Sequence, residues 1–191
     1  MKKPKIIFLT GVSGSGKTTM MELLLASSDV YEKVCSLTTR KPREGEVSWD
    51  HYVFTSSSEF EVLIKEKKLL EYAFVHQIAY YGTRMDWIQE TLQKGKSPVK
   101  TIDMVGMEII DTKNRMPDEY VCIFIDIPEE IMKERILWRQ EHMSGIELQH
   151  RLNSVELERA IAKRIQNCTI VDGSKTREEV FAQIQEVLSK V

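Results

Sequence analysis

The chain has 191 residues, 42% of them hydrophobic, which is enough for one compact domain with a substantial core. Its formal net charge of −2 argues against general nucleic-acid binding, and no apolar stretch is long enough to span a membrane. The three cysteines are far apart in sequence, which is typical of reduced thiols in a cytoplasmic protein rather than of a disulfide framework or a zinc site.

The first segment with recognisable chemistry covers residues 5–28. The apolar run Ile6–Leu9 predicts a buried strand, and apolar residues recur at helical spacing after Lys17. The segment between them matches the phosphate-loop pattern at every fixed position, and glycines there let successive backbone N–H groups point at phosphate oxygens. In this pattern Lys17 reaches the β and γ phosphates and Thr18 offers its hydroxyl to a magnesium ion. The predicted ATP-binding residues are Gly11, Val12, Ser13, Gly14, Ser15, Gly16, Lys17, Thr18 and Thr19.

Further along the chain, apolar periodicity and capping signals predict alternating strands and helices. Strands are expected over 33–37, 51–55, 69–75, 78–81, 99–102, 120–127 and 169–171. Helices are expected after the capping box of Ser56 and Glu59, over 84–94, over 104–115, after Pro128, over 144–165 and after Thr176. This alternation predicts an α/β protein with a parallel sheet covered by helices on both faces. Residues 36–93 break the alternation and resemble an insertion, while the charged segment 129–165 resembles a lid.

The insertion contains residues suited to binding a phosphate. Arg40 and Arg43 lie three positions apart in a polar turn, and the planar guanidinium group matches the paired oxygens of a phosphate. Tyr52 and Tyr81 could add neutral hydroxyl donors. Taken by themselves, the two arginines are better explained as cations that face solvent.

Glu71 interrupts the apolar strand Leu69–Val75, and a carboxylate in such surroundings needs a partner. Guanine offers one, because its ring N–H and its exocyclic amino group are adjacent donors that one carboxylate can accept. Adenine has an acceptor at the position of that ring N–H and would be rejected. The alternative is a glutamate at the edge of a strand that points into solvent.

In the charged lid segment, Arg135 and Arg139 are four residues apart and share a helix face, where like charges repel mildly. A polyanion between them would relieve that repulsion. The alternative is a solvated basic face among interleaved glutamates.

Several motifs in order resemble the guanylate kinase family across nearly the whole chain. They are the phosphate loop, Ser36-x-Thr38-Thr39-Arg40-x-Pro42-Arg43-x-Gly45-Glu46, Asp50-x-Tyr52-x-Phe54, Glu71-Tyr72-Ala73, Tyr80-Tyr81-Gly82-Thr83 and the lid arginines Arg135, Arg139 and Arg151. The resemblance implies a P-loop three-layer sandwich with a parallel central sheet, a small GMP-binding insertion and a helical lid. The corresponding divisions are a core of 1–35, 95–128 and 166–191, a GMP-binding region of 36–94 and a lid of 129–165.

The same resemblance implies Mg²⁺-dependent, in-line transfer of the ATP γ-phosphate to GMP. The implied GMP-binding residues are Ser36, Arg40, Arg43, Tyr52, Glu71, Tyr81, Thr83 and Asp103, and the implied catalytic residues are Lys17, Arg135, Arg139 and Arg151. The expected partners are ATP and GMP, with dGMP left open, and not nucleic acid or a membrane. The expected assembly is a monomer or a homodimer.

The chain departs from the family pattern after the strand expected at 99–102. Guanylate kinases usually read Asp-x-Asp-x-Gln-Gly there, whereas this chain has Thr101 and Val105 in place of the first acid and the glutamine. Two alternatives therefore stay open: a catalytically weak binding protein of the guanylate-kinase type, and a related kinase for another small phosphate or nucleotide. A regulatory GTPase is disfavoured, because the sequence contains no Asn-Lys-x-Asp motif to recognise guanine.

Overall fold

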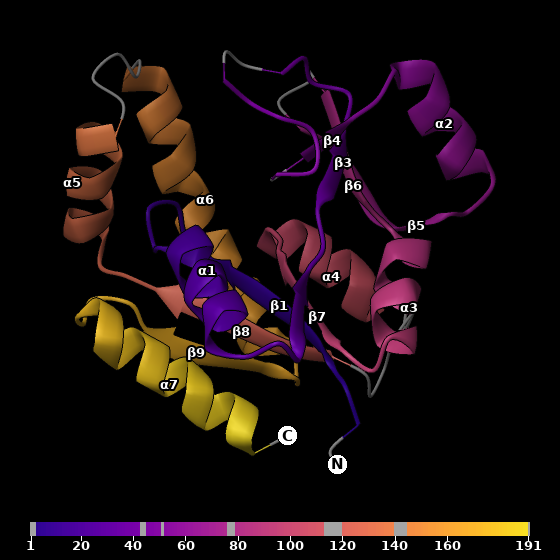
Figure 1. Cartoon of the computed structure of the whole chain (residues 1–191). Helices are drawn as coiled ribbons and strands as arrows, with labels where there is room; N and C mark the ends of the chain where they lie inside the picture. The colour runs from indigo at the N-terminus through magenta and orange to yellow at the C-terminus, as the bar shows by residue number, and fades with distance from the viewer. Residues whose placement is uncertain are drawn as a thin grey trace.

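The computed structural model describes residues 3–42, 45–50, 52–75, 79–112, 120–139 and 145–190. Within these ranges, the description leaves out the side chains of residues 75, 139, 145–148, 150 and 151. Figure 1 shows the described chain as a central sheet between two layers of helices, with a second, smaller sheet beside it.

The central sheet has five strands, and all of its pairings are parallel. Its order is β2 (Tyr31–Lys33), β7 (Ser97–Thr101), β1 (Ile6–Gly11), β8 (Tyr120–Asp126) and β9 (Cys168–Asp172). Every residue of β1 is buried, as expected for a strand covered on both faces. Because the strands run in the same direction, the segments that follow them gather at one edge of the sheet, where ligands of such folds bind.

Helices cover both faces of this sheet, which gives the three predicted layers (Figure 1). On one face, α1 (Lys17–Ser27) and α7 (Arg177–Ser189) pack their buried residues against β1, β8 and β9. On the other face lie α3 (Met85–Gln93), α4 (Met104–Thr112), α5 (Glu129–Arg139) and α6 (Gly145–Arg164). The predicted capping box of Thr176 and Glu179 starts α7, as expected.

The smaller sheet has the order β4 (Tyr52–Phe54), β3 (Ser36–Thr38), β6 (Ala79–Arg84) and β5 (Leu69–Val75), with α2 (Ser57–Lys65) beside it. The capping box of Ser56 and Glu59 starts α2 as predicted. Strands β5 and β6 are antiparallel, and their register places Glu71 directly opposite Thr83. This register brings two of the predicted guanine-binding residues into contact.

The prediction of a single strand over 33–37 is wrong. The chain forms β2 in the central sheet and β3 in the smaller sheet, and it crosses between the sheets at Val34 and Cys35. Both crossing residues are buried, so they read as strand residues and no glycine or proline marks the break. The predictions for His51, 76–78, 113–119 and Ser144 fall outside the described residues.

Cys122 and Cys168 are distant in sequence but adjacent in the structure. They face each other across β8 and β9, and the Cys122 thiol donates a hydrogen bond of 2.9 Å to the Cys168 sulfur. That bond, together with burial, raises the pKa of the Cys122 thiol. Two of the cysteines that are far apart in the sequence are therefore neighbours in the fold, and all three are free thiols, as predicted.

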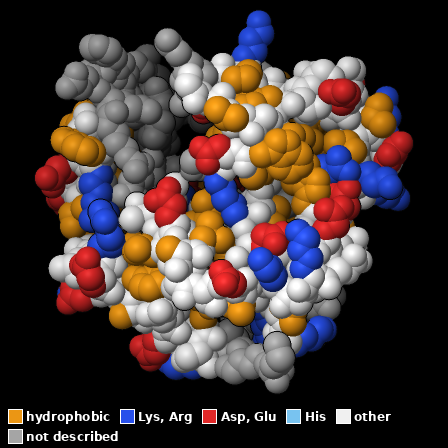
Figure 2. Space-filling model, viewed as in Figure 1, with side chains coloured by type: hydrophobic (Ala, Val, Ile, Leu, Met, Phe, Trp, Pro, Cys, Tyr) orange, Lys and Arg blue, Asp and Glu red, His pale blue; other side chains and the backbone are white. Residues whose placement is uncertain are grey.

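Acidic and basic side chains are interspersed on the face drawn in Figure 2, in keeping with the small net charge. Among the described residues, no helix combines the length and the apolar composition that crossing a bilayer requires.

Candidate active site

The phosphate loop connects β1 to α1 at the ligand-binding edge of the central sheet. Gly11 approaches β8 so closely that an added Cβ would lie 2.3 Å from the carbonyl oxygen of Ile125. Gly16 precedes α1 with a φ of 93°, a left-handed conformation that favours glycine. These two glycines let the chain turn from the strand directly into the helix, so the loop amides and the N-terminus of α1 form an anion-binding site.

The Lys17 ammonium lies over this loop. Its Nζ donates hydrogen bonds of 2.8 Å to the Gly11 carbonyl and 3.0 Å to the Val12 carbonyl. Close by, the hydroxyls of Thr10 and Ser15 are buried, and neither has a hydrogen-bond partner among the described residues. Buried polar groups are normally paired, so the Ser15 hydroxyl of the loop retains a hydrogen-bonding capacity that a ligand could use.

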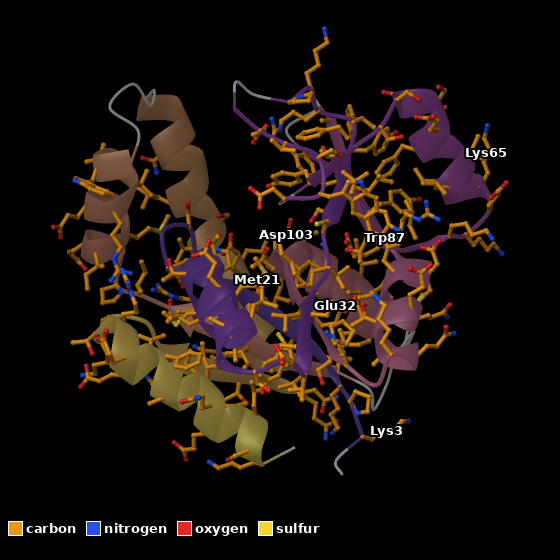
Figure 3. All side chains as sticks on the ribbon, in the orientation of Figure 1. Lys3, Met21, Glu32, Lys65, Trp87 and Asp103 are labelled. Carbon is orange, nitrogen blue, oxygen red and sulfur yellow. The ribbon has the colours of Figure 1, made fainter. Side chains whose placement is uncertain are left out.

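A cavity of about 380 Å³ lies between the phosphate loop and the smaller sheet. It is lined by residues from both sheets and from α6. Eight of the residues predicted from the sequence lie on its wall: Gly11, Ser13, Lys17, Ser36, Tyr52, Glu71, Tyr81 and Asp103. Figure 3 shows Asp103 at the junction between the central and smaller sheets. We call this space the acceptor cavity.

The predicted phosphate-binding residues of the insertion cluster on one side of the smaller sheet. The Arg40 guanidinium lies 5.3 Å from the ring centre of Tyr52, and the rings of Tyr52 and Tyr81 meet edge to face at 5.9 Å. Arg40 also donates two hydrogen bonds of 2.9 Å to the Glu46 carboxylate, and these bonds raise the pKa of Arg40. Arg43 lies outside the described residues.

The carboxylate of Glu71 points into the protein, not into solvent. Only 7% of the residue is exposed, and the Thr83 hydroxyl donates a hydrogen bond to it from β6. Burial raises the pKa of Glu71, whereas the positive charge of Lys100 and the Thr83 hydrogen bond oppose that rise. The alternative of a solvent-facing strand-edge glutamate is therefore wrong.

Asp103 lines the cavity and also accepts a hydrogen bond from the backbone of α4. Its Oδ1 accepts a hydrogen bond of 2.7 Å from the Gly106 N–H in the first turn of α4. Thr101, at the position of the missing acid, lines the same cavity. Val105 is 45% exposed on α4 and is not among the cavity-lining residues.

One predicted lid arginine can be placed. The Arg135 side chain comes from α5 and donates a hydrogen bond of 3.3 Å to the Gly14 carbonyl of the phosphate loop. With Gly14, Gly16 and Thr19 it lines a second cavity of about 370 Å³ beside the loop. Arg139 and Arg151 lie within α5 and α6, but their side chains fall outside the described ones.

The site also contains two charged residues that the sequence reasoning missed. Lys100 is 1% exposed and lines the acceptor cavity. Lys100 is, like Glu71, a charged residue within a predicted strand, and that feature could have indicated it. Glu158 lines the cavity from α6, where Ser154 donates a hydrogen bond of 2.8 Å to it and burial raises its pKa. It follows Arg151 by two helical turns, a same-face spacing that could have indicated it.

The residues present fit a magnesium ion that is held mainly by phosphate oxygens. Among the described side chains, no group of three or more acidic, cysteine or histidine residues forms a metal cage. Thr18 supplies a hydroxyl in the first turn of α1, and Asp103 and Glu158 place carboxylates on the wall of the cavity that Lys17 also lines. Magnesium commonly binds through few protein oxygens together with substrate phosphates and water, which matches this donor set.

Comparison with known proteins agrees with this geometry. The family model described as guanylate kinase matches residues 3–191. A guanylate kinase from Chlamydia muridarum is 33% identical over 182 residues, covering 95% of this chain and 86% of the relative. One from Bacillus subtilis is 36% identical over 156 residues, covering 80% and 74%.

A crystal structure of guanylate kinase from Anaplasma phagocytophilum has a TM-score of 0.71 and 22% identity, and the match covers all of this chain and 87% of that one. At that identity the match shows the fold. The family model and the two sequence relatives go further and favour an enzyme over a binding module. The chain therefore belongs to the guanylate kinase family and is a nucleoside monophosphate kinase.

Proposed function

We propose that the chain transfers the γ-phosphate of ATP to GMP in the presence of Mg²⁺, producing ADP and GDP. The observation that carries this proposal is the acceptor cavity. Lys17 of the phosphate loop lines it together with Glu71, Tyr52 and Tyr81 of the smaller sheet. A donor phosphate on the loop and an acceptor nucleotide in the cavity would then be neighbours, as direct transfer requires.

In this proposal the phosphate loop and Arg135 hold the donor nucleotide. The loop amides and the Lys17 ammonium would bind the phosphate chain, and Arg135 would add positive charge from α5. Thr18 would hold Mg²⁺ together with phosphate oxygens, and the ion when bound would neutralise part of the phosphate charge. Arg139 and Arg151 complete the proposed lid charges.

Arg40, Tyr52 and Tyr81 would hold the phosphate of GMP, together with Arg43. Their clustering supports this assignment, since a guanidinium and two phenol groups already lie within contact of one another. Ser36, Glu71, Thr83 and Asp103 would recognise the guanine base. The buried Glu71 supports that role, because a buried acceptor discriminates strongly between the donor and acceptor edges of a base.

No protein side chain needs to act as a nucleophile in this reaction. An oxygen of the GMP phosphate attacks the γ-phosphorus in line with the departing ADP oxygen, and the protein contributes positioning and charge neutralisation. The lid would exclude water and so suppress ATP hydrolysis. We retain the division into a core of 1–35, 95–128 and 166–191, a GMP-binding region of 36–94 and a lid of 129–165 as part of this proposal.

The test is steady-state ADP production from ATP and Mg²⁺ with GMP, dGMP, AMP, CMP, UMP or no acceptor. We expect turnover with GMP, no comparable turnover with AMP, CMP or UMP, and near-background ADP without an acceptor. Lys17→Met should lower the rate by about 100-fold or more, whereas Lys190→Met at the exposed end of α7 should not.

Turnover with another monophosphate but not with GMP would contradict the proposed acceptor. ADP formation that is independent of any acceptor would contradict the transfer reaction. The use of dGMP, a cytoplasmic location and the choice between monomer and homodimer stay predictions.

A further inference from the structure

Lys100 is a buried cation to which the mechanism above assigns no role. It lies on β7 opposite Phe8 of β1, and only 1% of it is exposed. Its Nζ donates a hydrogen bond of 2.7 Å to the Ser36 hydroxyl and one of 3.3 Å to the Cys35 carbonyl. Both Lys100 and Ser36 line the acceptor cavity. The central sheet therefore places an ammonium group on the wall of the pocket proposed to bind the base.

The charge of Lys100 is balanced by acidic groups around the same cavity. Burial lowers the pKa of Lys100 to about 8, while the nearby Glu71, Cys35 and Asp103 oppose that shift. At neutral pH the ammonium form therefore predominates. Burying a cation is costly unless it is paired, so the lysine and Glu71 stabilise each other's charged forms.

The hydrogen bond from Lys100 to Ser36 orients both groups. An ammonium can only donate, so the Ser36 oxygen accepts from it and the Ser36 hydroxyl keeps its own proton for another acceptor. Among the described residues Lys100 donates two hydrogen bonds, which leaves one of its three N–H groups for a ligand. The cavity thus combines a donor pair, Lys100 and Ser36, with the acceptor Glu71.

We propose that Lys100 is a specificity-determining residue that donates a hydrogen bond to the 6-oxo group of the bound purine. Guanine presents O6, N1–H and the 2-amino group in that order along one edge, which is an acceptor followed by two donors. The pair Lys100 and Ser36 matches the acceptor, and Glu71 matches the two donors. Adenine presents a 6-amino donor to the ammonium and a ring-nitrogen acceptor to the carboxylate, so both contacts become repulsive.

This inference rests on the proposed use of GMP. It adds recognition of the 6-position of the base to the contacts proposed for Glu71. A lysine that served only to balance the charge of Glu71 would affect every ligand in the cavity to the same extent. A lysine that contacts the 6-position makes affinity depend on the atom at that position. The difference can be measured with a ligand changed at that atom only.

The experiment compares GMP with 6-thio-GMP, in which sulfur replaces O6 and the N1–H and 2-amino groups are retained. Sulfur is the weaker hydrogen-bond acceptor. We would measure both dissociation constants by calorimetry for the unchanged chain, for Lys100→Met and for Lys65→Met. Lys65 lies on the outer side of α2, away from the cavity, and so controls for the loss of one charge (Figure 3).

We expect the unchanged chain and Lys65→Met to prefer GMP over 6-thio-GMP on the order of 10-fold, the loss expected for a charge-assisted hydrogen bond. In Lys100→Met that preference should largely disappear. Because each ratio is taken within one protein, a general weakening of the cavity cancels out. Should Lys100→Met fail to fold, Lys100→Gln, which keeps a neutral donor, should show a reduced preference.

An unchanged GMP to 6-thio-GMP ratio in a folded Lys100 variant would overturn the inference and leave the proposed function intact. A ratio near one in the unchanged chain would also overturn it. Failure of the unchanged chain to bind GMP would instead overturn the proposed acceptor, and the inference with it.

Discussion

The Thr83 hydroxyl donates a hydrogen bond of 2.5 Å to the Glu71 carboxylate across the antiparallel pair of β6 and β5. This bond holds one carboxylate oxygen while the side chain lies on the wall of the acceptor cavity. Thr83 is itself fully buried. The smaller sheet therefore supplies a fixed acceptor whose orientation is set by its neighbouring strand.

Replacing Glu71 by Gln should weaken GMP binding on the order of 10- to 100-fold, because the amide replaces one acceptor oxygen with a donor and removes the charge. ATP binding should change by less than about 2-fold, because the proposed ATP site lies on the phosphate loop. Calorimetry with each nucleotide measures both effects. Glu61→Gln, on an exposed position of α2, is the matched control. Equal losses for both nucleotides would mean that Glu71 is structural.

Thr101→Asp restores the acid that guanylate kinases usually carry at this position. Thr101 lines the same cavity as Lys17, Asp103 and Glu158, so a carboxylate there adds a hard oxygen ligand near the proposed metal position. We expect the Mg²⁺ concentration that gives half-maximal rate to fall several-fold. Thr112→Asp, at the exposed end of α4, should leave that concentration unchanged. An unaltered Mg²⁺ dependence in Thr101→Asp would contradict the idea that the lost acid affects metal binding.

Arg159 ties α6 to the end of β8. It donates hydrogen bonds of 3.0 and 3.1 Å to the Asp126 carboxylate and one of 3.0 Å to the Ile127 carbonyl. Arg159→Met should lower the free energy of unfolding in urea by about 2 kcal/mol. Arg164→Met removes a more exposed pair with Glu108 and should cost less than about 0.5 kcal/mol. Equal effects of the two changes would refute a special role for the Arg159 contacts.

GMP affinity should fall as the pH rises above 8. The Lys100 ammonium, with its pKa lowered to about 8, is mostly protonated at pH 7 but only about one-tenth protonated at pH 9. The donor to the 6-oxo group is therefore present below this pKa and lost above it. The groups that face it, Glu71, Cys35 and Asp103, oppose the loss of the proton.

Calorimetric titrations of GMP from pH 6.5 to 9.5 test this. The same titrations of Lys100→Met measure the effect of pH on the ionisation of the nucleotide and of other protein groups. The prediction therefore concerns the difference in pH dependence between the unchanged chain and Lys100→Met. Parallel curves over the whole range would show that Lys100 does not contribute through its charge.

Some parts of the site could be predicted because they depend on residues close together in the chain. The phosphate loop requires glycine conformations, a lysine and a helix start within a few residues, and the capping boxes of α2 and α7 require four. The strand around Glu71 made it a candidate for a similar reason, since a charge within an apolar strand needs a partner, although a solvent-facing glutamate stayed open until the structure showed it buried. In each case the physical requirement can be read from a short segment.

Other parts depended on which segments meet in space. The sequence gives no turn signal for the division of 33–37 between β2 and β3. Val34 and Cys35 remain buried while the chain passes from one sheet to the other. The contact between Cys122 and Cys168 follows from the register of β8 with β9.

The same distinction separates the two halves of the proposed base-recognition site. The sequence alone determined that the chain has a phosphate loop, a parallel α/β core and a carboxylate, Glu71, within an apolar strand. Only the tertiary structure decided that Lys100 of the central sheet and Glu71 of the smaller sheet face the same cavity. The physical reason is that the conformation of a loop is set by its own residues, whereas the balance of two buried charges exists only after separate sheets have packed together.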